Sequence, residues 1–169
     1  VWNAANLSFA LCNTLTNSAT DLLNQHGTKV QRNLYLKRLI SGEWTGAMAM
    51  TESQAGSDVG AISCKAYPDG DAYRLKGQKI FISWGEHNLT DNIIYLVLAR
   101  LPNAPAGSKG ISLFIVPKFI PDKNGKLDQR NEVICLALEQ KLGIHASPTC
   151  LMEFGANDGA LGWLIGDPH

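Results

Sequence analysis

The chain has 169 residues, of which 45% are hydrophobic and 18% are charged. This composition indicates a globular protein with a hydrophobic core and excludes an intrinsically disordered chain. Its 15 basic and 15 acidic residues cancel, so nothing favours nucleic acid or an anionic membrane through long-range attraction.

The four cysteines and four histidines lack metal-binding spacing: there is no CxxC pair, and no histidine lies four residues from another. We therefore expect no metal site. Free thiols favour a reducing compartment and hence the cytoplasm. The sequence starts at Val1 without a signal-peptide pattern and stops at His169, so we expect a piece of a longer protein.

The first forty residues carry a helical pattern. Apolar side chains recur at near-helical spacing, at Trp2, Leu7, Leu11 and Leu15. Gly27 is placed to end this helix, Thr28 can cap a second one, and Gly42 ends that. The second helix is expected to bury one face, made of Val30, Leu34, Leu36 and Ile40.

After Gly42 the pattern changes to short strands separated by turns. Strands are predicted around a turn at 68–71, over 93–99 and 111–116, beside the hairpin signal Asn124-Gly125, and over 132–139 and 150–154. Such spacing predicts a closed barrel or a sandwich. We expect an α+β fold, in which a helical segment over residues 1–42 precedes an antiparallel β-barrel over residues 43–169.

Two segments have the same unusual character. Residues 47–60 and 77–85 each begin as an apolar strand and end in hydroxyls and glycines. Side by side, they would form one wall of a cofactor pocket. In a two-residue period Phe81 and Ser83 share a face, so the ring could pack on a flat cofactor while the hydroxyl reaches a ring nitrogen. The alternative is an ordinary barrel strand with Phe81 in the core.

Other candidates are weaker. The run Gly56–Gly60 matches neither a Walker loop nor a dinucleotide fingerprint and is typical of a tight turn, whose amides can still hold an anion. For Glu52 and Asp58 we favour hydrogen bonds to loop amides over a catalytic pair. His87 and His145 could act as acid or base, but neither has a sequence partner.

Four motifs in the same order resemble those of the acyl-CoA dehydrogenases. They lie at residues 50–58, 70–83, 109–118 and 141–149, and Ser53 stands where that family commonly has proline. The form of residues 143–150 and 159–166 is most similar to the larger bacterial branch of the family.

The resemblance implies a parent with an N-terminal helical domain, a middle β-barrel and a C-terminal four-helix bundle. Residues 1–42 would be the last helices of the first domain and residues 43–169 the middle domain, while the bundle would be absent.

The resemblance also implies FAD as cofactor. The residues matching the family's two flavin-binding segments are Met48, Met50, Thr51 and Ser57, followed by Phe81, Ile82 and Ser83. Met50 and Thr51 would meet the pyrimidine edge of the flavin, and Ser57 would lie near the pyrophosphate and the CoA chain of the substrate. Phe81 stands where the family often has tryptophan, which keeps the packing and loses the indole N–H.

The implied reaction is α,β-dehydrogenation of an acyl-CoA, with electron-transfer flavoprotein as the acceptor and a parent that self-associates. The family's base is a glutamate on the bundle, which no residue here matches, so the chain alone is expected to be inactive. Alternatives are an acyl-CoA oxidase or related flavin monooxygenase, a non-catalytic binding or assembly member, and a stand-alone ligand-binding barrel.

Overall fold

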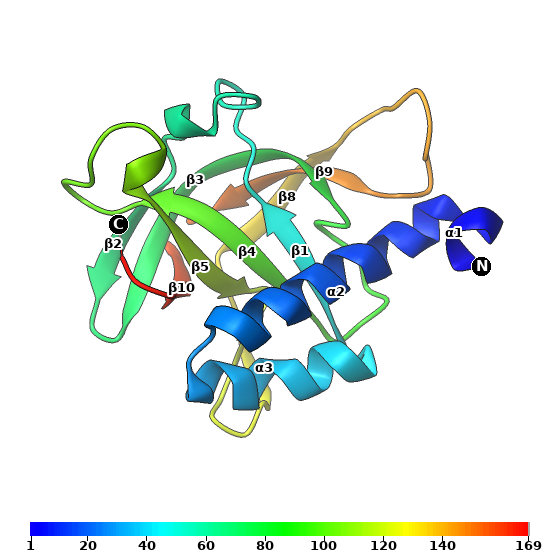
Figure 1. Ribbon diagram of the computed structural model, residues 1–169, viewed down its shortest axis with the longest axis horizontal. Coiled ribbons are helices and arrows are strands. Elements are labelled where there is room, and N and C mark those ends of the chain that lie inside the picture. The colour runs from blue at the N-terminus through cyan, green and yellow to red at the C-terminus, as the bar shows by residue number, and fades with distance from the viewer. Residues whose placement is uncertain (169) are drawn as a thin grey trace.

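The computed structural model describes residues 1–168, which form three helices, two of them packed against a curled sheet (Figure 1). The helices are α1 (Trp2–Ala5), α2 (Leu7–His26) and α3 (Lys29–Ser41). Thr28 caps α3 in a reciprocal capping box with Gln31, and Gly42 ends the helix in the left-handed region at φ 77°. The predicted helix ends at Gly27 and Gly42 are confirmed, but the first helix is interrupted at Asn6, which is extended and caps α2. Residue 169, the last of the expected barrel segment, lies outside the described residues.

The predicted buried face of α3 is wrong by about one position. Val30 and Ile40 are 75% and 72% exposed. The residues that the helix buries are Gln31, Tyr35 and Leu39. Gln31 can take a buried position because its Nε2 donates to the Leu164 carbonyl at 2.8 Å, which satisfies the amide inside the protein.

The strands follow the predicted turns closely. They are β1 (Trp44–Ala49), β2 (Lys65–Asp69), β3 (Ala72–Ser83), β4 (Asn92–Arg100), β5 (Ile111–Pro117), β6 (Phe119–Pro121), β7 (Leu127–Arg130), β8 (Val133–Leu138), β9 (Thr149–Phe154) and β10 (Ala160–Ile165). Short 3-10 turns lie at η1 (Val59–Ala61) and η2 (Ser108–Gly110).

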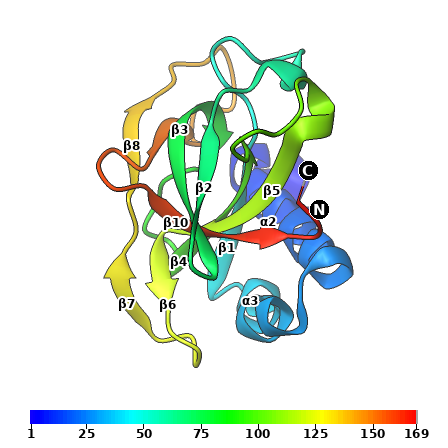
Figure 2. The same cartoon turned by 90° about the vertical axis from the view of Figure 1, so that its left-hand side faces the viewer.

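The main sheet runs in the order β1-β4-β5-β10-β3-β9-β8, and β2 pairs with both β3 and β4. These pairings join β4, β5, β10, β3 and β2 in a ring, whose strands curl around one another in Figure 2. The ring is completed by the single pair Lys65–Arg100. The α+β class with a barrel-like sheet is confirmed. One detail differs from the expectation: β1 is parallel to β4, because the β2–β3 hairpin intervenes before the chain returns.

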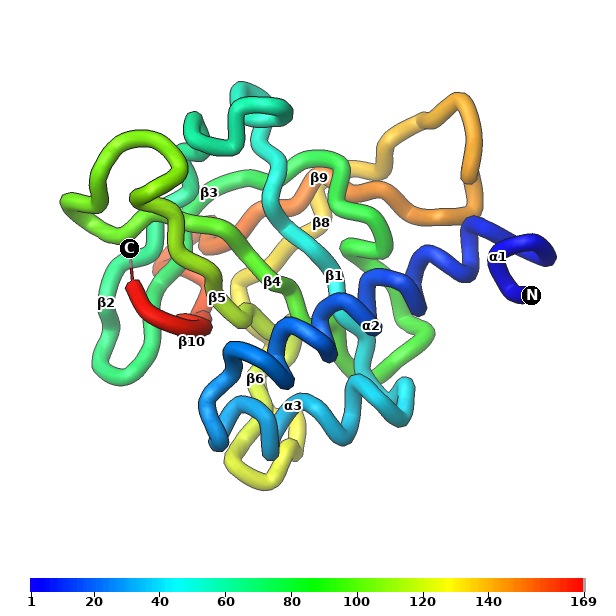
Figure 3. Tube along the Cα trace, viewed as in Figure 1, coloured from blue at the N-terminus to red at the C-terminus, as the bar shows by residue number. Residues whose placement is uncertain are grey.

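Hydrophobic side chains form two clusters. One fills the curled sheet with residues from β1 to β10, including Tyr95, Phe114 and Phe154. The other lies between the helices and the sheet and joins Leu23 and Leu39 to Ile94 and several further strand residues. Figure 3 shows that α2 crosses over β1.

Gly46 of β1 permits the close approach of α2 to this strand. A Cβ placed on Gly46 would lie 2.5 Å from the Ala19 Cβ, closer than real side chains pack.

Among the described residues, no helix is both long and apolar enough to cross a membrane.

Candidate functional site

The structure brings the two motif segments together. The chain leaves β1 at Ala49, and the Thr51 carbonyl then accepts a hydrogen bond from the Ile80 N–H of β3 at 2.9 Å. Segments that are almost thirty residues apart in the sequence therefore lie side by side, as the interpretation of a shared wall requires.

A β-bulge in β3 shapes this region. Lys79 pairs with Met152 and Ile82 with Cys150, so β3 has one residue more than β9 over this stretch. Phe81 lies in the bulge with φ 59°, a left-handed conformation that costs a non-glycine residue roughly 1–2 kcal/mol. Its side chain is 58% exposed rather than buried in the barrel core. Strain of this kind is typical of functional positions.

The other predicted site residues divide into two groups. Met50 is 46% exposed, Ser57 is exposed on the loop before η1, and Thr51 and Ser83 are half-buried. Two residues face the interior. Ile82 is 1% exposed, so its side chain belongs to the barrel core, and Met48 packs against the cluster beneath the helices.

Below the exposed residues lies a buried ion pair that the sequence interpretation missed. Lys79 Nζ lies 2.8 Å from Glu52 Oε1, and the side chains are 0% and 4% exposed. Glu52 also accepts from the N–H groups of Ser63 and Cys64 at 2.7 and 3.0 Å. Burial alone would raise the pKa of Glu52, but these hydrogen bonds outweigh it and lower the pKa to about 2.

Hydrogen bonding to loop amides is therefore confirmed for Glu52, while Asp58 is exposed. A signal for the pair was present, since a lysine interrupts the second apolar segment and an acid follows the first.

Arg100 holds the loop that carries Ser57. Its guanidinium donates to the carbonyls of Ile62, Pro105 and Gly107 at 2.9, 3.0 and 2.8 Å, and also to that of Gly60. One side chain thus ties the loop around η1 to the loop around η2. The run Gly107–Gly110 is anchored by one of these contacts. Nothing in the sequence marked Arg100, which looks like the end of an ordinary strand.

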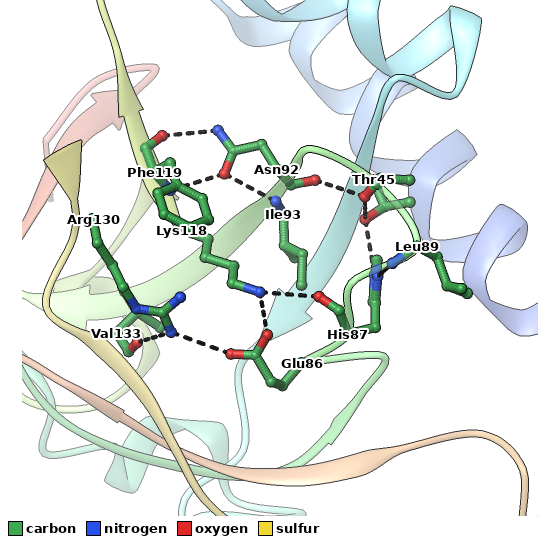
Figure 4. Close-up of polar contacts among 12 residues, drawn as sticks. Thr45, Glu86, His87, Leu89, Asn92, Ile93, Lys118, Phe119, Arg130 and Val133 are labelled. Atoms are coloured by element: carbon green, nitrogen blue, oxygen red, sulfur yellow. Dashed lines mark hydrogen bonds and ion pairs between the residues drawn. The ribbon is translucent and has the colours of Figure 1, made fainter. Parts of the chain in front are cut away.

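Neither of the two candidate histidines, His87 and His145, belongs to a catalytic arrangement among the described residues. The Leu89 N–H donates to Nδ1 of His87, which assigns the ring proton to Nε2, and Nε2 lies 3.1 Å from Thr45 Oγ1 (Figure 4). Burial and, to a smaller extent, the charge of Lys118 lower the pKa of His87. His145 is exposed on the β8–β9 loop.

A second ion-pair network lies beside His87. Lys118 Nζ contacts Glu86 and donates to the His87 carbonyl at 2.9 Å, while Arg130 lies 3.4 Å from Glu86 (Figure 4). These contacts join the loop after β3 to β7 and to the residue between β5 and β6, so we assign them to the scaffold.

Comparisons with known proteins identify the family. The family model of the acyl-CoA dehydrogenase middle domain matches residues 47–156. The chain is 49% identical to 3-methylmercaptopropionyl-CoA dehydrogenase of Ruegeria pomeroyi over 168 residues, which are 99% of this chain and 28% of the relative.

Two solved structures are also similar. One is Caenorhabditis elegans ACDH-11 in complex with C11-CoA, with a TM-score of 0.74, 32% identity and coverage of 94% of this chain and 27% of the other. The second is described as an electron transferring flavoprotein of Acidaminococcus fermentans, with a TM-score of 0.71, 31% identity and coverage of 88% and 35%. The motifs, the fold and these matches lead to one conclusion: the chain belongs to the acyl-CoA dehydrogenase family.

Proposed function

We propose that this chain supplies the flavin-facing barrel of a FAD-dependent enzyme that dehydrogenates an acyl-CoA thioester between its α and β carbons. One observation carries the proposal. The hydrogen bond from Ile80 N–H to the Thr51 carbonyl joins the two motif segments directly beside the exposed ring of Phe81. The acyl-CoA substrates in the names of the relatives support the substrate class.

The residues present fit a flavin. Phe81 and Met50, 58% and 46% exposed, offer apolar surface to a planar ring. Thr51 and Ser83, both half-buried, carry hydroxyl groups one and two residues further along the same two segments, and exposed Ser57 suits a pyrophosphate or the CoA chain. Ile82 can contribute only through its backbone, since its side chain is in the core. A role for Met48 stays a prediction.

When bound, FAD would accept the hydride from the substrate's β-carbon. The part of the chain described here has three tasks: Phe81 holds the ring, Ser83 offers a hydroxyl to it, and donors at Thr51 favour negative charge at its edge. We assign removal of the α-proton to a glutamate outside this chain. The chain alone is therefore expected to bind FAD weakly and to be inactive.

The same proposal extends to partners and location. The likeness to a structure described as an electron transferring flavoprotein supports such a protein as the electron acceptor. We also propose that the parent enzyme self-associates. All four cysteines are free thiols, which supports a reducing compartment such as the cytoplasm.

The test is FAD binding by the holoenzyme that contains this chain. We expect Phe81→Ala to raise the Kd for FAD about tenfold, within the range of aromatic stacking energies. Tyr67→Ala is a matched control, because Tyr67 is an aromatic residue 43% exposed on β2. Equal Kd values for wild type and Phe81→Ala would refute the site.

Activity is tested separately. The holoenzyme should reduce a dye with acyl-CoA substrates, whereas the 169-residue chain with added FAD should not. Clear turnover by the chain alone would refute its inactivity. Rapid oxidation of the reduced holoenzyme by oxygen would identify an oxidase instead of a dehydrogenase.

A further inference from the structure

The Glu52–Lys79 ion pair calls for an explanation beyond stability. Its two side chains are 4% and 0% exposed. Removing both charges from water costs several kcal/mol, and buried pairs often add little net stability for that reason. This pair lies where the two motif segments meet, which connects it with the proposed flavin site.

Three successive backbone carbonyls, those of residues 50–52, each accept a hydrogen bond from within the protein. Lys79 Nζ donates to the Met50 carbonyl at 3.0 Å. The Thr51 carbonyl accepts from Ile80 N–H, and the Glu52 carbonyl accepts from Ala55 N–H, both at 2.9 Å. The acceptors of residues 50–52 are thus all bonded within the protein.

A segment whose carbonyls already accept hydrogen bonds within the protein offers a ligand chiefly its N–H groups and its hydroxyl, because the carbonyl oxygens are held toward their internal donors. Within residues 50–52, the Glu52 N–H is bonded to the Ala55 carbonyl, which leaves the N–H groups of Met50 and Thr51 and the Thr51 hydroxyl. Such a segment favours an edge that carries acceptors or negative charge, because no carbonyl dipole opposes it.

We propose that Lys79 and Glu52 are positioning residues, which hold residues 50–52 so that N–H groups rather than carbonyls meet the flavin. This inference rests on the proposed function. Lys79 acts from β3 by binding the Met50 carbonyl, and Glu52 acts by holding Lys79. Glu52 also accepts from both N–H and Oγ of Ser63 at 2.7 Å, which fixes the far end of the loop that carries Ser57.

Loss of oriented N–H donors can be distinguished from a general loss of structure by comparing the binding of oxidised and reduced FAD. Loss of structure would weaken the binding of oxidised and of reduced FAD equally. Loss of oriented donors should weaken the binding of reduced FAD more, since the reduced form carries more negative charge at the edge. The ratio of the two dissociation constants is therefore the informative measurement, and the midpoint potential of bound FAD reports it.

The experiment uses the holoenzyme with the double variant Glu52→Gln/Lys79→Met, which leaves no buried charge unpaired. The single variant Lys79→Met tests the lysine alone. The matched control is Glu86→Gln/Lys118→Met, because Lys118 also pairs with a glutamate and donates to a backbone carbonyl, that of His87.

We expect the first double variant to lose about tenfold more affinity for reduced than for oxidised FAD. Tenfold corresponds to a shift of about 30 mV to more negative potential for a two-electron couple. The control should keep the wild-type potential. An unchanged potential in a folded, flavin-loaded double variant would overturn the inference and leave the proposed function standing. If the wild-type holoenzyme bound no FAD, the proposed function would fail, and this inference with it.

Discussion

The carboxylate of Glu52 should make this protein sensitive to acid. Its pKa is lowered from 4.5 to about 2 in the folded protein. A lowered pKa means that the unfolded chain binds the proton more tightly, so the stabilisation is complete above about pH 5 and is lost as the pH falls.

The size of the effect follows from the shift. A difference of about 2.5 pKa units corresponds to roughly 3 kcal/mol of folding free energy at pH 7. Linkage then predicts that about 2 kcal/mol of it has been lost at pH 3. Because Glu52 is 4% exposed, solvent screening takes little from this value.

The assay is urea unfolding at pH 7, 5, 4 and 3, for the wild type and for Glu52→Gln/Lys79→Met. The other carboxylates with lowered pKa values, Asp122 and Glu132, are present in both proteins, so their contributions cancel in the difference. The stability of the wild type relative to the variant should fall by about 2 kcal/mol between pH 7 and pH 3. A difference that stays constant across this range would refute the reasoning.

Three further outcomes are expected. Gly46→Ala should lower the free energy of unfolding by about 1–3 kcal/mol in urea titrations, because the new methyl group meets Ala19, whereas Gly143→Ala, where nothing lies within 4 Å, should change it little; equal effects would contradict this packing. In urea titrations, the free energy of unfolding of Phe81→Gly should exceed that of Phe81→Ala by about 1 kcal/mol, since glycine adopts φ 59° without strain. Both variants should bind FAD less well than the wild type. A less stable glycine variant would argue against strain at the bulge. Arg100→Met should speed proteolysis of the loops around η1 and η2 at least severalfold, and Arg100→Lys should restore only part of the protection because a lysine cannot reach four carbonyls; unchanged cleavage would show that the loops do not depend on this side chain.

Local patterns predicted most of the elements in this fold. Thr28, Gly42 and the Asn124-Gly125 turn specify their own backbone geometry, and their helices and hairpin begin and end as expected. The orientation of α3 could not be predicted in this way. It depends on Gln31 reaching the carbonyl of Leu164, a contact between residues 133 positions apart.

The candidate site was predictable in its motifs but not in its supports. Sequence placed Thr51 and Phe81 in related segments, and the structure puts those segments side by side. The bulge at Phe81 comes from a mismatch with β9, which no local pattern contains. Lys79 and Arg100 act on carbonyls of distant loops, and carbonyls leave no mark in a sequence because every residue has one.

The parallel pairing of β1 with β4 imposes an order on assembly. Strand β1 ends at Ala49, but its partner is not complete until Arg100, so a newly made chain must hold β1 unpaired while some fifty residues follow. The helices share this dependence, because Leu23 and Leu39 pack against Ile94 of that later strand. The helical segment therefore has no finished core of its own, and helices and barrel should form in one cooperative step rather than in succession.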